Sequence, residues 1–447
     1  MERLVVAGGV AAGLSAASAA KRLKKNDIEV EVFEKSGYIS YGACSEPYFV
    51  SGMLTTPDDL IEITPEEFER KRSIRIYRQH EVVDIDYERG FVDVLDIGKG
   101  KTSRHDFDYL MIATGAKGKG LGVPGEDLDG INTLRTVEDA IRIQQSALSG
   151  NDVVICGGGY IGLEMAEAFV ELGKNVTILK KTSQMLLNFD PEMSKIVEEE
   201  VRSKGVVIET GVDVLSFEGD TRVNKVITNK GEFKADTVLI AKGAKPNVDL
   251  AEKIGVELGE TGAIAVDKHQ RTNLERVYSG GDCAEAYHMV LGKPAYIPLG
   301  TTANKAGRVA GENIGGLNTE FKGIVGTAVS KIFDLEVART GLSLKEAKNA
   351  GFDAYATNIR HRSRSKHYVG GWPITVQFIT EAGSKRLLGA QMIGKEGAAL
   401  RINVLAAALY SGMTVEDIYR LDLGYAPAFA PAWDPILIAA NRARKGA

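Results

Sequence analysis

Near its N-terminus the chain reads Leu4-Val5-Val6-Ala7-Gly8-Gly9-Val10-Ala11-Ala12-Gly13, an apolar run that leads into a glycine turn and an alanine-rich helix. Over residues 4–35 the pattern changes from a strand-like run to a helical period and back, which predicts a βαβ unit. Gly8 and Gly13 suit the tight turn and the close contact of helix and strand, while Val10 stands at the middle glycine position of the usual fingerprint. The helix N-terminus would face a phosphate, so we expect a dinucleotide site here.

The second strand of this unit is expected to end at Glu34, with Lys35 after it. Glu34 lies 21 residues after Gly13, where a carboxylate accepts both ribose hydroxyls. An adenosine without a 2′-phosphate fits this arrangement, so the first copy suits FAD or NAD.

The same pattern returns over residues 153–181, where Gly157-Gly158-Gly159-Tyr160-Ile161-Gly162 matches the fingerprint in full. Two such turns in one chain are a far stronger signal than one. The strand of this copy ends at Lys180-Lys181 instead of an acidic residue. A lysine pair attracts a 2′-phosphate, which favours NADPH over NADH, although lysines at strand ends are also commonly just solvated.

Two further segments indicate which copy holds the flavin. Tyr109–Gly115 is a short apolar strand that ends in Ala113-Thr114-Gly115, and a second strand ends in Gly280-Gly281-Asp282. Glycines there permit close approach, and Asp282 is placed to bond a ribityl hydroxyl. Both motifs are typical of FAD domains of the glutathione-reductase-like group, so we assign FAD to the first copy.

A single cysteine, Cys44, follows the first βαβ unit in Ser40-Tyr41-Gly42-Ala43-Cys44-Ser45-Glu46-Pro47-Tyr48. Flavin disulfide reductases with two cysteines carry the second one five positions later, where this chain has Phe49, so no intramolecular disulfide forms here. Ser45-Glu46-Pro47 is expected to open a helix, whose N-terminus would favour the thiolate and lower the pKa of Cys44. The alternative is a buried, inert cysteine.

Composition excludes several classes of function. A net charge of −5 and a pI near 5.9 leave no global field for nucleic acid. The three cysteines are too few and too scattered for a disulfide framework or a metal site. The first strand begins almost at Met1 and no apolar run reaches membrane-spanning length, so we expect a soluble, cytoplasmic protein without a signal peptide.

With these motifs together, the whole chain resembles the single-cysteine pyridine nucleotide–disulfide oxidoreductases, and most of all coenzyme A (CoA) disulfide reductases and their NAD(P)H oxidase and persulfide reductase relatives. The resemblance also covers Pro65-Glu66-Glu67-Phe68 and the C-terminal segment 425–435, which reads YAPAFAPAWDP. It implies an α/β, glutathione-reductase-like fold with two Rossmann-type domains and a C-terminal α+β dimerisation domain. We place a split FAD-binding domain at 1–115 and 244–321, an NAD(P)-binding domain at 116–243 and the dimerisation domain at 322–447.

The resemblance also assigns roles to residues. Cys44 is the redox nucleophile, Tyr425 of the partner subunit helps to protonate the leaving thiolate, and Tyr368 is a second aromatic contact; either tyrosine could instead be an interface anchor. Tyr160 covers the nicotinamide face of the flavin until the cofactor displaces it, with Glu164 nearby. The expected FAD contacts are Gly8, Val10, Ala11, Gly13, Glu34, Lys35, Ala113, Thr114, Gly115, Gly281, Asp282, Thr301, Thr302 and Ala303. The expected NAD(P) contacts are Gly157, Gly159, Tyr160, Ile161, Gly162, Glu164, Lys180, Lys181 and Gly243.

A CoA substrate carries several negative charges and needs cations near Cys44 or across the dimer. Ser15, Arg22 and Ser40 match CoA-binding positions of the family, and Arg72 and Asn304 fall at related places, with Lys71 as a further candidate. The segment Arg360–His367, with Arg362 and Lys366, is unusually basic for an acidic protein. It is either a phosphate clamp or a plain surface loop.

We therefore expect an FAD-dependent NAD(P)H oxidoreductase that reduces CoA disulfide or mixed CoA disulfides through Cys44. Persulfide or polysulfide reduction with CoA as a held cofactor, and NAD(P)H oxidation by oxygen, are alternatives that differ only in the acceptor. A flavin electron carrier that needs no thiol is a rival from another class. A peroxidase is disfavoured because Ala11 occupies the place of that group's histidine. The family implies a homodimer, with a tetramer left open, and the sequence indicates no metal and no nucleic-acid partner.

Overall fold

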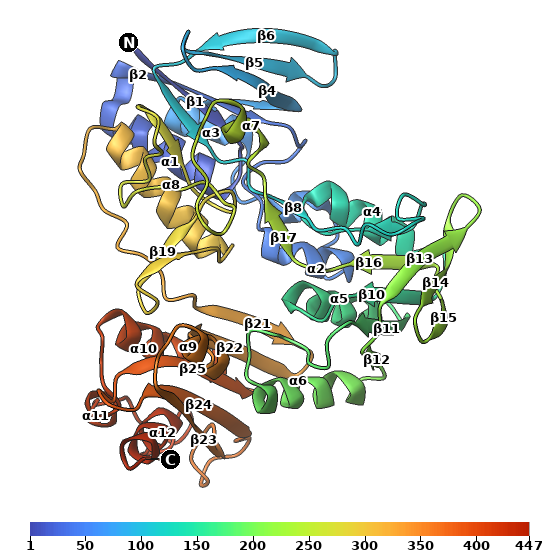
Figure 1. Cartoon of the computed structure of the whole chain (residues 1–447), viewed down its shortest axis with the longest axis vertical. Coiled ribbons are helices and arrows are strands. Elements are labelled where there is room, and N and C mark those ends of the chain that lie inside the picture. The colour runs from blue at the N-terminus through green and yellow to red at the C-terminus, as the bar shows by residue number, and fades with distance from the viewer. Residues whose placement is uncertain (447) are drawn as a thin grey trace.

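The computed structural model describes residues 1–446 and contains three five-stranded sheets (Figure 1). Two of them include the strands of the two glycine-turn repeats, and the third is formed by the C-terminal region. The first sheet has five parallel strands in the order β18-β7-β1-β2-β3. Its strands are β1 (Glu2–Ala7), β2 (Ile28–Glu34), β3 (Arg75–Arg78), β7 (Tyr109–Ile112) and β18 (Val277–Ser279).

The two faces of this sheet are covered by different layers because its strands are apolar on both sides. Leu4 and Val6 of β1 pack toward the helices α1 (Ala11–Lys24), α3 (Pro65–Arg72) and α8 (Gly300–Ile314). Val5 and Ala7 pack toward an antiparallel sheet of β4 (His80–Asp86), β5 (Phe91–Asp96) and β6 (Lys101–Asp106), and near α7 (Asp249–Lys253).

The second sheet repeats this plan, as the internal repeat predicts. It has five parallel strands in the order β12-β11-β10-β16-β9. They are β9 (Ile131–Asn132), β10 (Asp152–Cys156), β11 (Asn175–Lys180), β12 (Val207–Thr210) and β16 (Thr237–Ile240). One face carries α4 (Val137–Ala147), α5 (Tyr160–Glu171) and α6 (Pro191–Ser203), and the other the antiparallel β13 (Val214–Gly219), β14 (Val223–Thr228) and β15 (Gly231–Lys234).

A two-stranded antiparallel ribbon joins the two units. It pairs β8 (Ala116–Gly118) with β17 (Ala244–Pro246), so the chain enters and leaves the second unit side by side. A further hairpin, β19 (Ala286–His288) with β20 (Lys293–Ala295), precedes α8.

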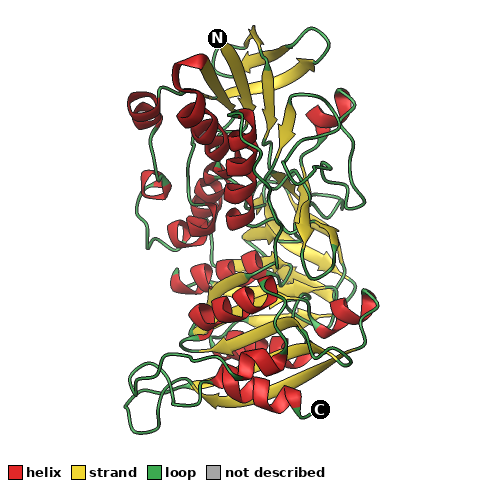
Figure 2. Ribbon diagram, turned by 90° about the vertical axis from the view of Figure 1, so that its left-hand side faces the viewer, coloured by secondary structure: helices red, strands yellow, loops and turns green. Residues whose placement is uncertain are grey.

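The C-terminal unit is an antiparallel sheet in the order β21-β22-β25-β24-β23. Its strands are β21 (Ala328–Ile332), β22 (Leu335–Gly341), β23 (Ala354–Arg362), β24 (Pro373–Glu381) and β25 (Leu387–Gly394). The helices are α9 (Leu344–Asn349), α10 (Ala398–Tyr410), α11 (Val415–Tyr419) and α12 (Pro435–Arg444). Figure 2 shows how the helices and the sheets of the molecule lie in layers.

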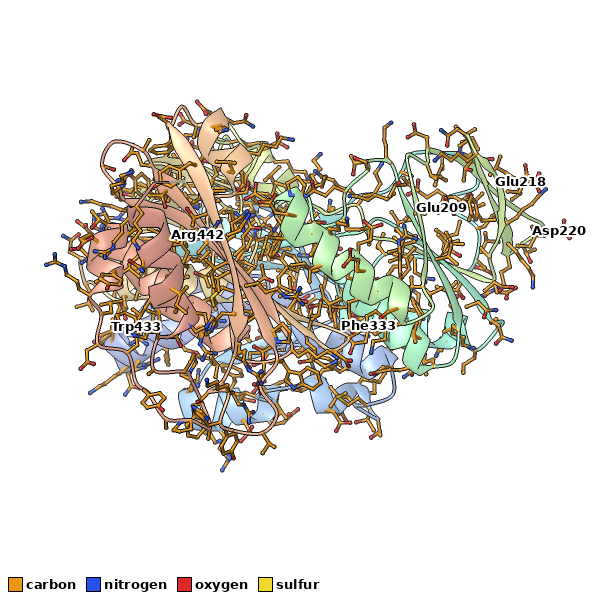
Figure 3. The ribbon with its side chains drawn as sticks, turned by 90° about the horizontal axis from the view of Figure 1, so that it is seen from below. Glu209, Glu218, Asp220, Phe333, Trp433 and Arg442 are labelled. Carbon is orange, nitrogen blue, oxygen red and sulfur yellow. The ribbon has the colours of Figure 1, made fainter. Side chains whose placement is uncertain are left out.

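Polar contacts attach the C-terminal unit to the second nucleotide-binding unit. The Phe333 backbone N–H, in the β21–β22 turn, donates to Glu167 of α5 at 2.6 Å, and Figure 3 shows Phe333 close to α6. Asp190 accepts from Gln391 Nε2 at 2.8 Å, and Arg339 of β22 donates to the carbonyl of Asn188. The three-unit α/β, glutathione-reductase-like fold expected from the sequence is confirmed.

Within residues 1–446, no helix has the length and apolar character that crossing a membrane requires.

Candidate active site

Cys44 lies in a 3₁₀ turn, η2 (Ala43–Ser45), that leads into the short helix α2 (Glu46–Val50). α2 packs against α4 and α5 of the second unit, so the segment of Cys44 spans the junction of the two nucleotide-binding units (Figure 1). Cys44 is exposed, whereas Cys156 and Cys283 are buried in the cores of the two units. Among the described residues Cys44 therefore has no disulfide partner, in agreement with the sequence.

The expectation of a lowered thiol pKa is wrong for this arrangement. Although Cys44 reaches the surface, the protein around its sulfur desolvates the thiol and raises its pKa. The carboxylates of Glu164, Glu46 and Asp282 raise this pKa further, and Arg135 opposes them. α2 is five residues long and starts after Cys44, so its dipole is small. Desolvation of the thiol, the neighbouring Glu46, and two carboxylates from distant parts of the chain together outweigh the local helix end.

Glu164, one turn into α5, is the first of these carboxylates. Burial raises its pKa to about 6, and Glu167 adds to the rise, while a hydrogen bond from Ser330 Oγ at 2.7 Å opposes it. Glu164 thus changes charge near neutral pH, next to the thiol.

The first glycine turn has the geometry of a nucleotide cradle. Gly8 has φ +116°, and a side chain there would collide with the carbonyl of Ala113, while one at Gly13 would collide with the carbonyl of Gly8. Val10 precedes α1 and offers no side-chain cap, and the first turn of α1, which begins at Ala11, has no acidic residue. The N–H groups of α1 are thereby left for an anionic ligand such as a pyrophosphate.

Glu34 ends β2 inside this cradle. Its carboxylate is buried and accepts from the N–H groups of Gly9 at 2.7 Å and Ser36 at 2.8 Å. These bonds fix the side chain beside the glycine turn, with lone pairs left for ribose hydroxyls. Lys35, the next residue, is exposed.

The second glycine turn repeats the first almost atom for atom. Gly157 has φ +132°, and side chains at Gly157 and Gly162 would collide with the carbonyls of Ala241 and Gly157. Gly159 precedes α5 without a side-chain cap, and Tyr160 and Ile161 begin the helix. The N–H of Ala241 donates to the backbone carbonyl of Cys156, as the N–H of Ala113 donates to the backbone carbonyl of Ala7.

Lys180 is the structural counterpart of Glu34. Its Cδ lies against Gly158 just as the Glu34 side chain lies against Gly9. Burial lowers the pKa of Lys180, and Lys181 is exposed and pairs with Asp213 at 2.8 Å. A cation thus occupies the ribose position of the second cradle.

The crossing segments of the two cradles also correspond. Gly115 has φ +68° and Gly243, after the second crossing, has φ +91°, and each precedes a strand of the connecting ribbon. Thr114 Oγ1 donates to the carbonyl of Asn247 at 2.6 Å, which ties the two crossings together.

Tyr160 is held by the loop between β11 and α6. Its hydroxyl accepts from Asn188 Nδ2 at 3.3 Å, and its ring meets Phe189 edge to face with 6.3 Å between centroids. Burial raises the pKa of Tyr160 to about 12, so the hydroxyl stays protonated. Tyr160 and Glu164 lie one helical turn apart and therefore share a face of α5.

Asp282 and the start of α8 complete the first cradle. Gly281 has φ +86° and lies against Ala12, and Asp282 Oδ2 accepts from Arg135 Nη2 at 2.7 Å. Thr302 and Ala303 are buried and Thr301 is exposed in the first turn of α8. Neither Arg135 nor Glu46 was predicted from the sequence as a site residue. The one sequence feature that could have indicated Glu46 is an acidic residue at the start of an otherwise apolar short helix.

Several of the CoA-binding candidates meet along α1. Ser15 donates to Asn304 Oδ1 at 2.9 Å, and Arg72 donates to Ser18 one turn further on. Arg22 is exposed one turn beyond Ser18, so α1 carries a polar strip with cations at one end. Elsewhere, Lys71 pairs with Glu67 at 2.6 Å, and Ser40, with φ +49°, bonds through its backbone to Gly9 and Glu62.

The two tyrosines that are expected to reach a partner subunit belong to neighbouring loops of the C-terminal unit. The Ser365 N–H donates to the Pro427 carbonyl at 3.3 Å, and Arg401 Nη2 donates to the carbonyls of Ser363 and Phe429. Tyr368 and Tyr425 are both exposed. Of the basic segment, Arg364 pairs with Glu396 at 2.6 Å, whereas Arg362 and Lys366 are exposed.

Comparisons with known proteins cover the whole chain. An "NAD(P)H coenzyme A polysulfide/persulfide reductase" of Pyrococcus horikoshii is 41% identical over 443 residues, which are 98% of each chain. A "Coenzyme A disulfide reductase" of Staphylococcus aureus is 28% identical over 99% of this chain and all of that one. The solved "NAD-Dependent Persulfide Reductase from A. fulgidus" is 38% identical, superposes with a TM-score of 0.96, and is matched over 99% of this chain and 83% of its own.

Two family models match consecutive parts of the sequence. Residues 2–307 match "Pyridine nucleotide-disulphide oxidoreductase", a family that uses FAD and NAD(P)H, and residues 327–435 match its dimerisation domain. The chain belongs to the pyridine nucleotide-disulphide oxidoreductase family.

Proposed function

We propose that this protein reduces the sulfur–sulfur bond of CoA disulfide or of mixed CoA disulfides with electrons from NAD(P)H, through the thiolate of Cys44. The observation that carries the proposal is the position of Cys44: it is the exposed cysteine at the junction of two nucleotide cradles, and the other two cysteines are buried. A thiol without an internal partner must form its disulfide with the substrate.

The first cradle is proposed to hold FAD. Gly8 and Gly13 leave room for the pyrophosphate at the N-terminus of α1, Glu34 binds the ribose hydroxyls, and Asp282 binds the ribityl chain. Ala113, Thr114, Gly115 and the first turn of α8 line the same cradle. When bound, FAD accepts hydride from NAD(P)H and passes the electron pair to sulfur.

The second cradle is proposed to hold the dinucleotide, with NADPH preferred. Gly157, Gly159 and Gly162 form the phosphate turn, and Lys180 and Lys181 meet the 2′-phosphate where Glu34 of the first copy meets a hydroxyl. Tyr160 covers the path to the flavin until the nicotinamide displaces it.

The protein's own groups do the sulfur chemistry. The Cys44 thiolate attacks one sulfur of the substrate, forms a mixed disulfide and expels a thiolate that must be protonated. In a homodimer, Tyr425 of the partner subunit hydrogen-bonds the leaving sulfur and helps to protonate it, and the partner's Tyr368 contacts the substrate. The polar strip of Ser15, Arg22, Arg72 and Asn304, with Arg362 and Lys366 across the dimer, binds the phosphates of CoA.

Persulfide or polysulfide reduction is a second candidate, favoured by the relatives from P. horikoshii and A. fulgidus that carry those names. The same mechanism applies, since a Cys44 persulfide accepts an electron pair as a mixed disulfide does. Either function suits the cytoplasm, where thiols stay reduced.

The deciding experiment is anaerobic NADPH oxidation by CoA disulfide and by polysulfide at matched concentrations. Faster, saturable turnover of CoA disulfide supports the proposal, and fast polysulfide turnover with slow CoA disulfide turnover supports the second candidate. NADPH loss only in air would contradict both and indicate an oxidase. Cys44→Ser should abolish turnover with both acceptors, while Cys156→Ala, at a buried cysteine, should retain it; full activity of Cys44→Ser would indicate an electron carrier.

A further inference from the structure

Glu46 is a buried acid two residues after the nucleophile. It is the first residue of α2 and only 3% exposed, and its Oε1 has no hydrogen-bond partner among residues 1–446. Ionising a buried carboxyl group that has an unpaired oxygen is unfavourable, because no protein donor replaces the water that the oxygen has lost. Glu46 is therefore a neutral acid in this conformation; burial and the carboxylate of Asp139 raise its pKa to about 8.

Arg135 has a matching unpaired atom. Its Nη2 donates to Asp282, but its Nε is also enclosed by protein and has no partner among the described residues. Arg135 is close enough to Glu46 to lower the pKa of that carboxyl. Within residues 1–446, Glu46 Oε1 and Arg135 Nε are thus both enclosed by protein and both without a hydrogen-bond partner. An ionised Glu46 could be stabilised by Arg135.

The groups around Glu46 come from several segments. On its own segment they are Tyr41 and Cys44, in the loop before α4 Arg135, and on α4 Glu138 and Asp139; Glu164 of α5 acts on Cys44. Arg135 is the cation in this set that acts on both Cys44 and Glu46. A Cys44 thiolate adds another negative charge, so it is favoured when Glu46 carries a proton.

We propose that Glu46 is the proton-holding partner of Cys44: it is a neutral acid while Cys44 is a thiolate, and a carboxylate facing Arg135 when Cys44 is bonded to a second sulfur. This inference rests on the redox role of Cys44 in the proposed function. Glu46 acts through the charge on Cys44, by holding or releasing a proton.

The two half-reactions balance with this role. In the first, Cys44–S⁻ attacks R–S–S–R′, the Cys44–S bond forms and the S–S bond breaks, and R′S⁻ leaves with the proton that Glu46 releases, as R′SH. In the second, the hydride of NAD(P)H supplies two electrons and a proton by way of the flavin, so that Cys44–S–S–R becomes Cys44–S⁻ and RSH. Glu46 regains its proton from solvent, and the net reaction consumes one disulfide, one NAD(P)H and one proton.

The test counts protons. Holoenzyme with a free Cys44 thiolate and an oxidised flavin is mixed anaerobically at neutral pH with one equivalent of CoA disulfide. The weak buffer contains an indicator dye, and mass spectrometry measures the Cys44–CoA adduct. Glu46→Gln mimics the neutral acid, but its amide cannot release a proton at neutral pH. We expect it to differ from wild type by about one proton per adduct, taken up from solution. Asp58→Asn, at an exposed acid of the 3₁₀ turn η3 (Pro57–Leu60) that contacts α2, should match wild type.

An equal proton count in wild type and Glu46→Gln would overturn the role of Glu46. Absence of the adduct in wild type would instead overturn the proposed function, and with it this inference. A second measurement needs no variant: with the flavin oxidised throughout, the infrared difference spectrum between free-thiolate and CoA-loaded wild type should show loss of a protonated carboxyl band. A spectrum without that loss would likewise overturn the proposal.

Discussion

Arg135 and Asp282 form an ion pair across the junction of the two nucleotide-binding units, with 2.7 Å between Nη2 and Oδ2. Asp282 follows the last strand of the first sheet, and Arg135 precedes α4 on the second. The pair places one cation among the carboxylates around Cys44, where it is the group that opposes their effect on the thiol pKa. The charged surroundings of Cys44, the proposed redox site, are thus built from both units.

The contact between α1 and α8 depends on glycines. A side chain at Gly311 would collide with the carbonyl of Ala16, because the two helix backbones approach closely there. Gly311→Ala should lower the free energy of unfolding by about 3 kcal/mol. Gly383→Ala, in an exposed turn with no atom near the added Cβ, should change it by less than about 0.5 kcal/mol. Urea unfolding measures both, and equal stability of the two variants would contradict the packing argument.

The choice of dinucleotide should follow the charge at Lys180. Lys180→Glu copies the position of Glu34 in the first cradle, where a carboxylate would repel a 2′-phosphate. We expect kcat/KM for NADPH to fall at least about tenfold while that for NADH is retained or rises. Lys195→Glu makes the same charge change on the exposed side of α6 and should leave the ratio unchanged. An unchanged ratio in Lys180→Glu would show that the lysine is merely solvated.

Dimer formation should depend on the exposed aromatic loop of the C-terminal unit. Phe429 is 79% exposed in the single chain, and Trp433, which Figure 3 shows on the side away from the second nucleotide-binding unit, is 56% exposed. Such apolar exposure indicates an interaction surface. Phe429→Asp should shift the protein toward monomer in sedimentation velocity and lower its activity, because the role proposed for Tyr425 requires a partner subunit. Leu148→Asp, at an 80% exposed site on the second unit, should stay dimeric.

Acid should destabilise the fold through His288. This side chain is 1% exposed, and burial lowers its pKa from 6.5 to about 4. The unfolded chain then binds a proton more readily than the folded one, so its contribution is complete above about pH 6.5 and is lost as the pH falls toward 4. The loss amounts to about 3 kcal/mol. In His288→Gln the difference in unfolding free energy between pH 7 and pH 4.5 should shrink; an unchanged difference would place the effect in other groups.

The local features of the fold could be predicted from the sequence. The two glycine turns, with Gly8 and Gly157 at φ above +100°, and the strand ends at Glu34 and Lys180 follow from patterns that short-range sterics impose. The solitary state of Cys44 followed from the phenylalanine at position 49. These features depend on neighbours within one βαβ unit, which is why the pattern of residues suffices.

The electrostatics of Cys44 were decided only by tertiary structure. The sequence near Cys44 indicated a helix end that lowers the thiol pKa, yet Glu164 and Asp282 arrive from other elements and raise it. Coulomb interactions act through space, and their partners depend on how α2, α4, α5 and the turn after β18 pack. The sequence by itself determined two glycine-turn cradles and one cysteine without an internal partner. The packing of the units determined which charges surround that thiol, because no local pattern records a contact between distant segments.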